Sequence, residues 1–289
     1  AAQRERGPLR RVARELVGEL LPGARVLVLE LDARRPDGVL QRRLRAFDVE
    51  GGRRGLALGA KARLLAGLRA VAAAASADAV IVIVGTNNDW ETEGHDRDTL
   101  DLPGTQAELI ERVTLANANS AIVVNAGAPI SSDWAENAPA VLQAWFGGQE
   151  MANALVDVLF GDAEPAGRLP TTFPQRIEHT PSFGNFPGEH GQVRYGEGLL
   201  MGYRWYEARR LPVAFAFGHG MSYTSFAFDT PRISCAAVPA SALLEQTVSV
   251  VVPITNTGRR RGAEIVQCYV GAVSPLASRP PKELKAFEK

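Results

Sequence analysis

Residues 79–84 read Ala-Val-Ile-Val-Ile-Val, so an extended chain at this point has no polar side. A strand of this kind has to be covered on both faces, which is typical of a parallel sheet packed between helices. Two more apolar strands are predicted at 121–125 and 140–145, with helices at 105–118 and 149–160. This alternation predicts an α/β fold, a mostly parallel sheet flanked by helices.

The helices carry their own start and stop signals. Thr105 and Glu108 form the Thr-x-x-Glu pattern of a capping box, which predicts the start of the first of these helices. Gly161 is expected to be the C-cap of the last one. A further helix is predicted over 60–77. Leu64, Leu65, Leu68 and Val71 stand at helical spacing in 60–77, and Leu109, Ile110 and Val113 form an apolar stripe in 105–118. In 149–160 we expect four residues to face inward, Met151, Leu155, Val158 and Leu159.

The composition changes along the chain, which suggests several units. Residues 1–50 are rich in Arg and Leu, and 24–31 in this stretch has the pattern of a strand. Residues 162–228 are dominated by Pro and aromatic side chains and show little periodicity. We expect this segment to be an extended, loop-rich wrap around the α/β unit.

A different pattern follows from residue 246. Apolar residues alternate strictly over 248–254, a turn is predicted at 256–258, and 264–270 has the pattern of a second strand. These features predict a β-hairpin of an antiparallel sandwich. Such a sandwich needs about 100 residues, so we expect the part up to Lys289 to be incomplete.

Composition excludes several classes of protein. Lys and Arg total 32 and Asp and Glu total 32, and this balance gives no sign of a nucleic-acid-binding face. No apolar run approaches the ~18 residues that a membrane helix needs. The two cysteines, Cys235 and Cys268, exclude a disulfide scaffold and favour a reducing, cytoplasmic setting. The four histidines lack metal-ligand spacing, so we expect neither a metal nor a cofactor.

Chemistry is concentrated in one loop, just after the strand 79–84. It holds six carboxylates, Asp89, Glu91, Glu93, Asp96, Asp98 and Asp101, with Trp90, His95 and Arg97 among them. Ligands bind at the carboxyl ends of parallel strands, so the loop lies where a site is expected. An EF-hand is excluded because Leu100 stands at a ligand position and no Gly or Glu follows at the required spacing. A solvated acidic loop is the alternative interpretation.

The motifs in and after this loop carry a family resemblance. Trp90-Glu91-Thr92-Glu93-Gly94-His95-Asp96-Arg97, followed by Asp101-Leu102-Pro103, resembles the acid/base loop of glycoside hydrolase family 3 β-glucosidases. Further blocks agree in order: Gln143-Ala144-Trp145, Gly147-Gly148-Gln149-Glu150, Gly167-Arg168-Leu169-Pro170, Arg194-Tyr195-Gly196-Glu197-Gly198, Gly202-Tyr203-Arg204 and Phe217-Gly218-His219-Gly220. The stretch from Asn256-Thr257-Gly258 to Glu283-Leu284 is similar to the fibronectin type III-like domain of the same enzymes.

The resemblance implies a domain plan. Residues 51–228 would be the C-terminal α/β sandwich domain of the family, and 229–289 the start of its fibronectin type III-like domain. Residues 1–50 would be the tail of a β-sandwich inserted in some members. The N-terminal (β/α)₈ barrel, which carries the nucleophilic Asp in this family, would lie outside this chain.

The resemblance also implies an activity and assigns residues to it. The chain would contribute the general acid/base to a retaining β-glucosidase-like hydrolase that cleaves terminal, non-reducing β-D-glycosides, with small oligosaccharides or aryl β-glycosides as substrates. Glu93 would be the acid/base, with Glu91 as the second choice. Trp90 and Arg97 belong to the same loop, and Arg97 is expected to hold it through an ion pair with another acid. Without the barrel the chain is expected to be inactive; the alternative is a non-catalytic carbohydrate-binding or scaffold fragment.

Overall fold

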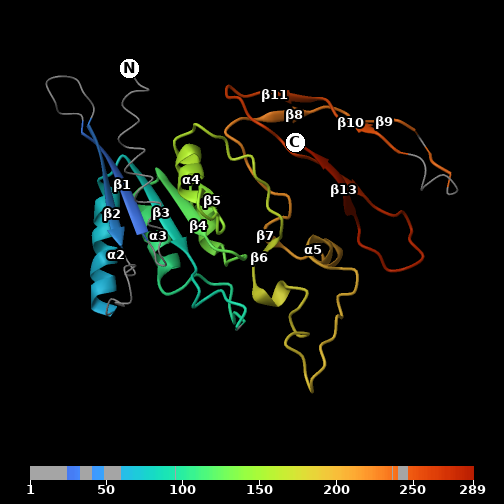
Figure 1. Ribbon diagram of the computed structural model, residues 1–289, viewed down its shortest axis with the longest axis horizontal. Helices are drawn as coiled ribbons and strands as arrows, with labels where there is room; N and C mark the ends of the chain where they lie inside the picture. The colour runs from blue at the N-terminus through green and yellow to red at the C-terminus, as the bar shows by residue number, and fades with distance from the viewer. Residues whose placement is uncertain (1–24, 33–40, 49–59, 95, 236, 240–246) are drawn as a thin grey trace.

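The computed structural model describes residues 25–32, 41–48, 60–94, 96–235, 237–239 and 247–289. Its centre is one sheet with the strand order β2-β1-β3-β4-β5 (Figure 1). The parallel strands are β3 (Ala79–Gly85), β4 (Ser120–Asn125) and β5 (Val141–Gln143). Two antiparallel strands complete it, β1 (Arg25–Asp32) and β2 (Gln41–Asp48). The three strands predicted from 79 to 145 are therefore confirmed, although β5 is shorter than expected.

The strand predicted at 24–31 is β1, and it pairs with β3 in register from Arg25↔Ile83 to Leu29↔Ala79. Val26 and Val28 are fully buried in the core of the α/β unit. This part of the first fifty residues thus belongs to the same sheet as β3. The assignment of 1–50 to the tail of an inserted sandwich stays a prediction, as do the domain limits at 51 and 229.

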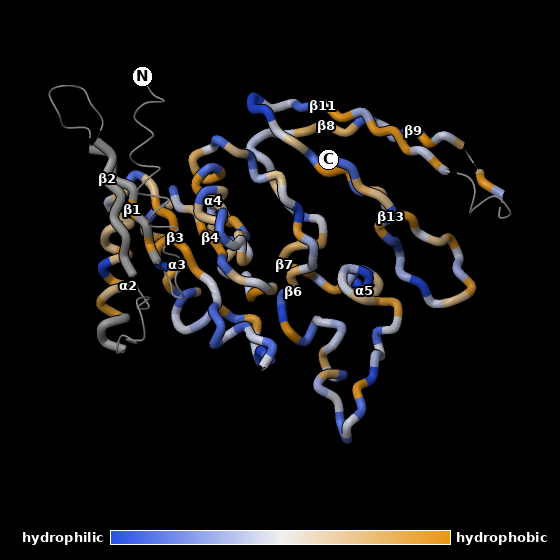
Figure 2. The backbone as a smooth tube through the Cα atoms, viewed as in Figure 1, coloured by the Kyte–Doolittle hydropathy of each residue, from blue (hydrophilic) through white to orange (hydrophobic). Residues whose placement is uncertain are grey.

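Helices cover both faces of the sheet. On one face, α2 (Ala60–Ala75) and α3 (Gln106–Ala116) pack against Val80, Val82 and Ile122. On the other, α4 (Met151–Leu159) packs Leu155 and Val156 against Ile83 and Val123. Figure 2 shows the resulting apolar concentration along β3 and β4. The α/β sandwich is confirmed.

The helix ends differ from the predicted signals. Thr105 is the N-cap of α3, but its side chain makes no capping hydrogen bond, so the capping-box prediction is wrong. Glu108 instead forms an ion pair with Arg112, one turn along the exposed side. At the end of α4 the C-cap is Phe160, and Gly161 follows it in the left-handed conformation, with φ of +74°.

The buried side of α2 is made of small residues. Ala70 and Ala74 are fully buried, whereas Leu64, Leu65 and Leu68 are 58%, 47% and 48% exposed. In α3, by contrast, Leu109, Ile110 and Val113 are all buried as expected.

The segment 162–228 is largely irregular, as expected of a wrap. Up to residue 225, its regular pieces are the paired strands β6 (Phe173–Pro174) and β7 (Val213–Phe215), the 3₁₀ turn η2 (Ile177–His179) and the short helix α5 (Tyr203–Arg209). Another 3₁₀ turn, η1 (Asp133–Asn137), precedes β5. The sequence did not predict α5. It lies beside the last strands (Figure 1), where the Tyr203 hydroxyl accepts the Leu284 N–H at 2.8 Å.

The last strands pair antiparallel, as predicted, but with other partners. They are β8 (Phe226–Phe228), β9 (Arg232–Ile233), β10 (Val250–Val251), β11 (Ile254–Asn256), β12 (Val266–Val270) and β13 (Glu283–Glu288). β11 pairs with β8, β10 with β9, and β12 with β13. The predicted hairpin between 248–254 and 264–270 is therefore wrong, because sandwich strands commonly pair across long connections.

Candidate active site

The acidic loop begins where β3 ends against β4. Gly85 closes β3 and lies so near the Asn125 backbone that a Cβ at this position would collide with the Asn125 carbonyl oxygen. Gln106 of α3, which is 1% exposed, binds the N–H and the C=O of Gly85 with its side-chain amide. The loop therefore leaves the sheet from a fixed point.

A turn around Asn87 sets the direction of the loop. The Asn87 carbonyl accepts the N–H groups of Trp90 at 2.9 Å and Glu91 at 2.8 Å. Its side-chain Oδ1 accepts the Asp89 N–H at 2.9 Å. Such local side-chain to backbone bonds are typical of Asx turns, and here they turn Glu91 back toward the sheet.

Glu91 and Arg97 are brought together, and both contact the segment after β4. Glu91 Oε1 lies 3.2 Å from Arg97 Nη1, and Glu91 Oε2 accepts the Gly127 N–H at 2.9 Å. Arg97 Nη1 also donates to the Pro129 carbonyl at 3.4 Å. The Glu91 and Arg97 side chains are 13% and 14% exposed. The expected ion pair of Arg97 with a loop acid is therefore present, and its partner is Glu91.

Burial dominates the electrostatics of Arg97. Desolvation lowers the pKa of Arg97, while the charges of Glu91 and Asp101 act in the opposite direction. Arg97 Nε and Nη2 are buried without a hydrogen-bond partner in the described part of the chain. The guanidinium thus depends on Glu91 for its ion pair.

Glu93 lies in a different environment from Glu91. It is exposed, and Gly94 follows it, with the Gly94 N–H directed at Thr92 Oγ1 at 3.3 Å. The salt bridge of Arg97 goes to Glu91 and leaves Glu93 beside solvent. The two glutamates of the motif therefore differ: Glu91 is bonded to Arg97 and to the Gly127 N–H, whereas Glu93 is exposed.

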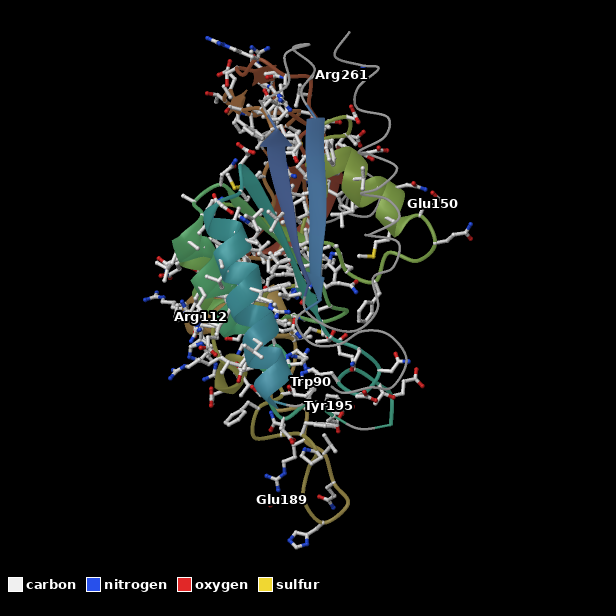
Figure 3. All side chains as sticks on the ribbon, turned by 90° about the vertical axis from the view of Figure 1, so that its left-hand side faces the viewer. Trp90, Arg112, Glu150, Glu189, Tyr195 and Arg261 are labelled. Carbon is white, nitrogen blue, oxygen red and sulfur yellow. The ribbon has the colours of Figure 1, made fainter. Side chains whose placement is uncertain are left out.

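The other loop residues flank this arrangement. Trp90 is half-buried, and its Nε1 has no hydrogen-bond partner among the described residues. It lies at the same end of the molecule as Glu189 and Tyr195 of the wrap (Figure 3). Asp101 accepts a hydrogen bond from the Thr99 hydroxyl at 2.8 Å, which fixes the exit of the loop.

A pocket beside the wrap reaches the acidic loop. A pocket of about 320 Å³ lies between Arg97 and the wrap, where Thr172, Thr180 and Tyr206 line it. A larger pocket of about 650 Å³ lies between α5 and β12 and has no residue of the acidic loop in its lining. In the described ranges, no three His, Cys, Asp or Glu side chains gather in a way that could hold a metal ion. Nor does any described helix have the length and apolar character to cross a membrane.

Three contributing residues were not found from the sequence. Gly127 and Pro129 contact the Glu91–Arg97 pair, and Gln106 holds the start of the loop. The sequence did contain a signal for Gly127 and Pro129. They come just after β4, and the carboxyl ends of neighbouring parallel strands meet at one edge of the sheet, so residues there can be expected to contact the acidic loop. For Gln106 the helical pattern gave no signal, since it is a polar residue on a buried side.

Comparisons with known proteins agree with the motifs. Residues 54–223 match the model of the glycosyl hydrolase family 3 C-terminal domain. The chain is similar to probable beta-glucosidase I of Aspergillus terreus, with 45% identity over 224 residues. It is also similar to probable beta-glucosidase J of Neosartorya fischeri, with 44% identity over 223 residues. In both cases the match covers 76% of this chain and 26% of the relative.

Solved structures share the fold. The GH3 beta-glucosidase of Bifidobacterium adolescentis has a TM-score of 0.72 at 38% identity, covering 81% of this chain and 33% of that one. The beta-glucosidase of Kluyveromyces marxianus in complex with glucose has a TM-score of 0.73 at 33% identity, covering 93% and 37%. Because the family model matches more than half of the residues, the chain belongs to glycosyl hydrolase family 3 and carries the C-terminal domain of that family.

Proposed function

We propose that the chain supplies the general acid/base of a retaining β-glucosidase-like hydrolase. The relatives named above are β-glucosidases, and this chain spans 26% of the length of the curated ones. We infer that a (β/α)₈ barrel joined to this chain supplies the nucleophilic carboxylate. The substrates would be small oligosaccharides or aryl β-glycosides with a terminal, non-reducing β-D-sugar.

The observation that carries the assignment is the contrast between the two glutamates. Both oxygens of Glu91 are engaged, one by Arg97 and one by the Gly127 N–H. The Glu93 carboxyl group is exposed in a loop at the carboxyl end of a parallel strand. A general acid must be able to reach the leaving oxygen, so Glu93 is the candidate that fits.

The proposed reaction proceeds in two steps. A carboxylate of the barrel attacks the anomeric carbon, the glycosidic C–O bond breaks, and Glu93 gives its proton to the leaving oxygen. Glu93, now a carboxylate, takes a proton from a water molecule, whose oxygen attacks the same carbon and releases the enzyme carboxylate. The two carboxyl groups would be about 5–5.5 Å apart, and the proton balance closes without a cofactor.

The position of Arg97 supports this role. A guanidinium beside Glu93 would favour the ionised carboxylate and oppose proton donation. The structure has Arg97 bonded to Glu91 and Pro129 instead. Glu91, Arg97 and Trp90 would therefore shape the loop, and the proton would move at Glu93.

The test is the dependence of rate on the leaving group in the enzyme with its barrel. Glu93→Gln is expected to lower kcat/KM about 10²- to 10⁴-fold on substrates with poor leaving groups, and less on activated aryl glycosides in the glycosylation step. Azide is expected to restore turnover of Glu93→Ala by attacking the glycosyl-enzyme. Asp98→Asn, which removes an exposed carboxylate from the same loop, is the control. If Glu91→Gln shows the leaving-group pattern and Glu93→Gln does not, the assignment is wrong.

A further inference from the structure

We propose that Glu91 is a positioning residue, which holds Glu93 at a fixed place by closing the loop around it. This inference rests on the proposed function, since it names the group that sets the geometry of the acid/base. Glu91 itself transfers no proton in this scheme.

The first argument is the topology of the contact. Glu91 precedes Glu93 by two residues, Arg97 follows it by four, and the 3.2 Å ion pair joins the two ends. The segment between them, which contains Glu93, is therefore a small closed loop. Thr92, Glu93 and Gly94, the described residues that follow Glu91, are exposed, so their position depends on what holds Glu91 and Arg97.

The second argument is that both ends are fastened to the same strip of backbone. Glu91 accepts the Gly127 N–H, and Arg97 donates to the Pro129 carbonyl two residues further on. This strip follows β4, the strand parallel to β3, so the closed loop is fixed to the sheet edge. The ion pair thus sets the position of the loop relative to the sheet as well as its shape.

The third argument is the fit around the carboxylate. A Cβ at Gly127 would lie 2.7 Å from Glu91 Oε2 and 2.8 Å from the Phe146 ring, so only glycine leaves room for the carboxylate there. Both charged side chains are largely shielded from water, and removing one partner of a shielded pair leaves the other uncompensated. The arrangement is therefore a rigid support.

A double-mutant cycle in the enzyme with its barrel tests the proposal. Glu91→Gln keeps the shape of the side chain and removes the charge. We expect it to lower kcat/KM on poor leaving groups about 10- to 100-fold, because a small displacement of a catalytic group costs that much. In the Glu93→Gln background we expect the same substitution to cost about twofold or less, since the group being positioned is already gone.

The outcomes separate this proposal from the assignment of Glu93. Suppose that Glu93→Gln shows the leaving-group pattern, but that Glu91→Gln lowers kcat/KM by the same factor in the wild-type enzyme and in the Glu93→Gln enzyme. Glu91 then acts through the fold or through substrate binding, and only the positioning role is overturned. If Glu93→Gln shows no such pattern, both proposals are overturned.

A second variant reaches the carboxylate from the other side and covers the case in which Glu91→Gln does not fold. Gly127→Ala is expected to displace Glu91 Oε2 and therefore to lower kcat/KM on poor leaving groups, as Glu91→Gln does. In the Glu93→Gln background it should change kcat/KM by about twofold or less. Gly167→Ala is the matched control, because it lies outside the acidic loop and no atom lies within 4 Å of the Cβ that it adds. A Gly127→Ala enzyme with unchanged activity on poor leaving groups would contradict the positioning role.

Discussion

The side-chain amide of Gln106 binds the backbone of Gly85 at two points. Gln106 Oε1 accepts the Gly85 N–H at 2.8 Å, and Gln106 Nε2 donates to the Gly85 carbonyl at 3.0 Å. The amide thus binds the backbone of the last residue of β3, at the position where the acidic loop leaves the sheet. Because Gln106 is almost fully buried, the loss of either bond would leave the N–H or the C=O of Gly85 without this partner, away from water.

Gln106→Glu is predicted to destabilise the chain in a pH-dependent way. A carboxylate cannot donate to the Gly85 carbonyl, and we expect the free energy of unfolding to fall by about 2–3 kcal/mol near neutral pH. Protonation of the introduced carboxyl group restores a donor, so the folded-state pKa of that group rises above the unfolded value of about 4.3. A raised pKa means that stability is lost as pH rises, so the penalty is larger at about pH 7 than at about pH 5.

Urea unfolding at both pH values measures this penalty. Gln175→Glu, at an exposed position, is the control and should change little. A Gln106→Glu penalty that stays constant with pH would show that the donor to Gly85 is not what matters.

How much of the fold follows from sequence depends on whether the signal is local. Buried strands such as 79–84 are recognised from their composition, because burial on both faces demands a continuous apolar run. In α2 the leucines mark the helical spacing, yet Ala70 and Ala74 form the buried side. Small residues let the helix approach the sheet closely, and a pattern that counts large apolar side chains misses this.

The pairing of the last strands is where sequence reasoning failed. The partner of β12 is β13 and the partner of β11 is β8. The apolar pattern of a strand predicts that it pairs but does not identify the strand with which it pairs. The same limit applies to the site. The motif suggested an ion pair for Arg97, but the choice of Glu91, and the part played by Gly127, depend on how β3 and β4 bring two segments together.

The 289-residue chain alone is predicted to be inactive on aryl β-glucosides. The chain offers Glu93 as acid/base, while the nucleophile is proposed to belong to the barrel. The measurement is release of the aryl alcohol by the purified chain, with Glu93→Ala as the control. Turnover by the wild-type chain above that control would show that a complete pair of carboxylates is present.

Tyr206 is predicted to make stability fall at alkaline pH. Burial raises the pKa of Tyr206 to about 12 from the ordinary 10.0, because the phenolate would lose its hydration. Between these values the folded chain holds a proton that the unfolded chain has released, so the free energy of unfolding decreases as pH rises. Tyr206→Phe should weaken this decrease, measured by urea unfolding across the interval. Tyr195→Phe, at a side chain that is 81% exposed, should leave it unchanged.

Hydrogen exchange is predicted to differ sharply between β3 and the loop that follows it. The amides of β3 are paired with β1 on one side and β4 on the other, and Val82, Ile83 and Val84 are buried. Exchange there requires a large opening of the fold, whereas exposed loop amides need almost none.

Within the loop we expect a gradient. The Glu91 amide, bonded to the Asn87 carbonyl at 2.8 Å, should exchange more slowly than the amide of Gly94, whose contact with Thr92 Oγ1 is long and exposed. Glu91→Gln should speed exchange at residues 91–94, because the ion pair that closes this segment is lost, and leave β3 protected. Mass spectrometry of the purified chain can resolve these segments. Protection at 92–94 equal to that of β3 would contradict an exposed Glu93.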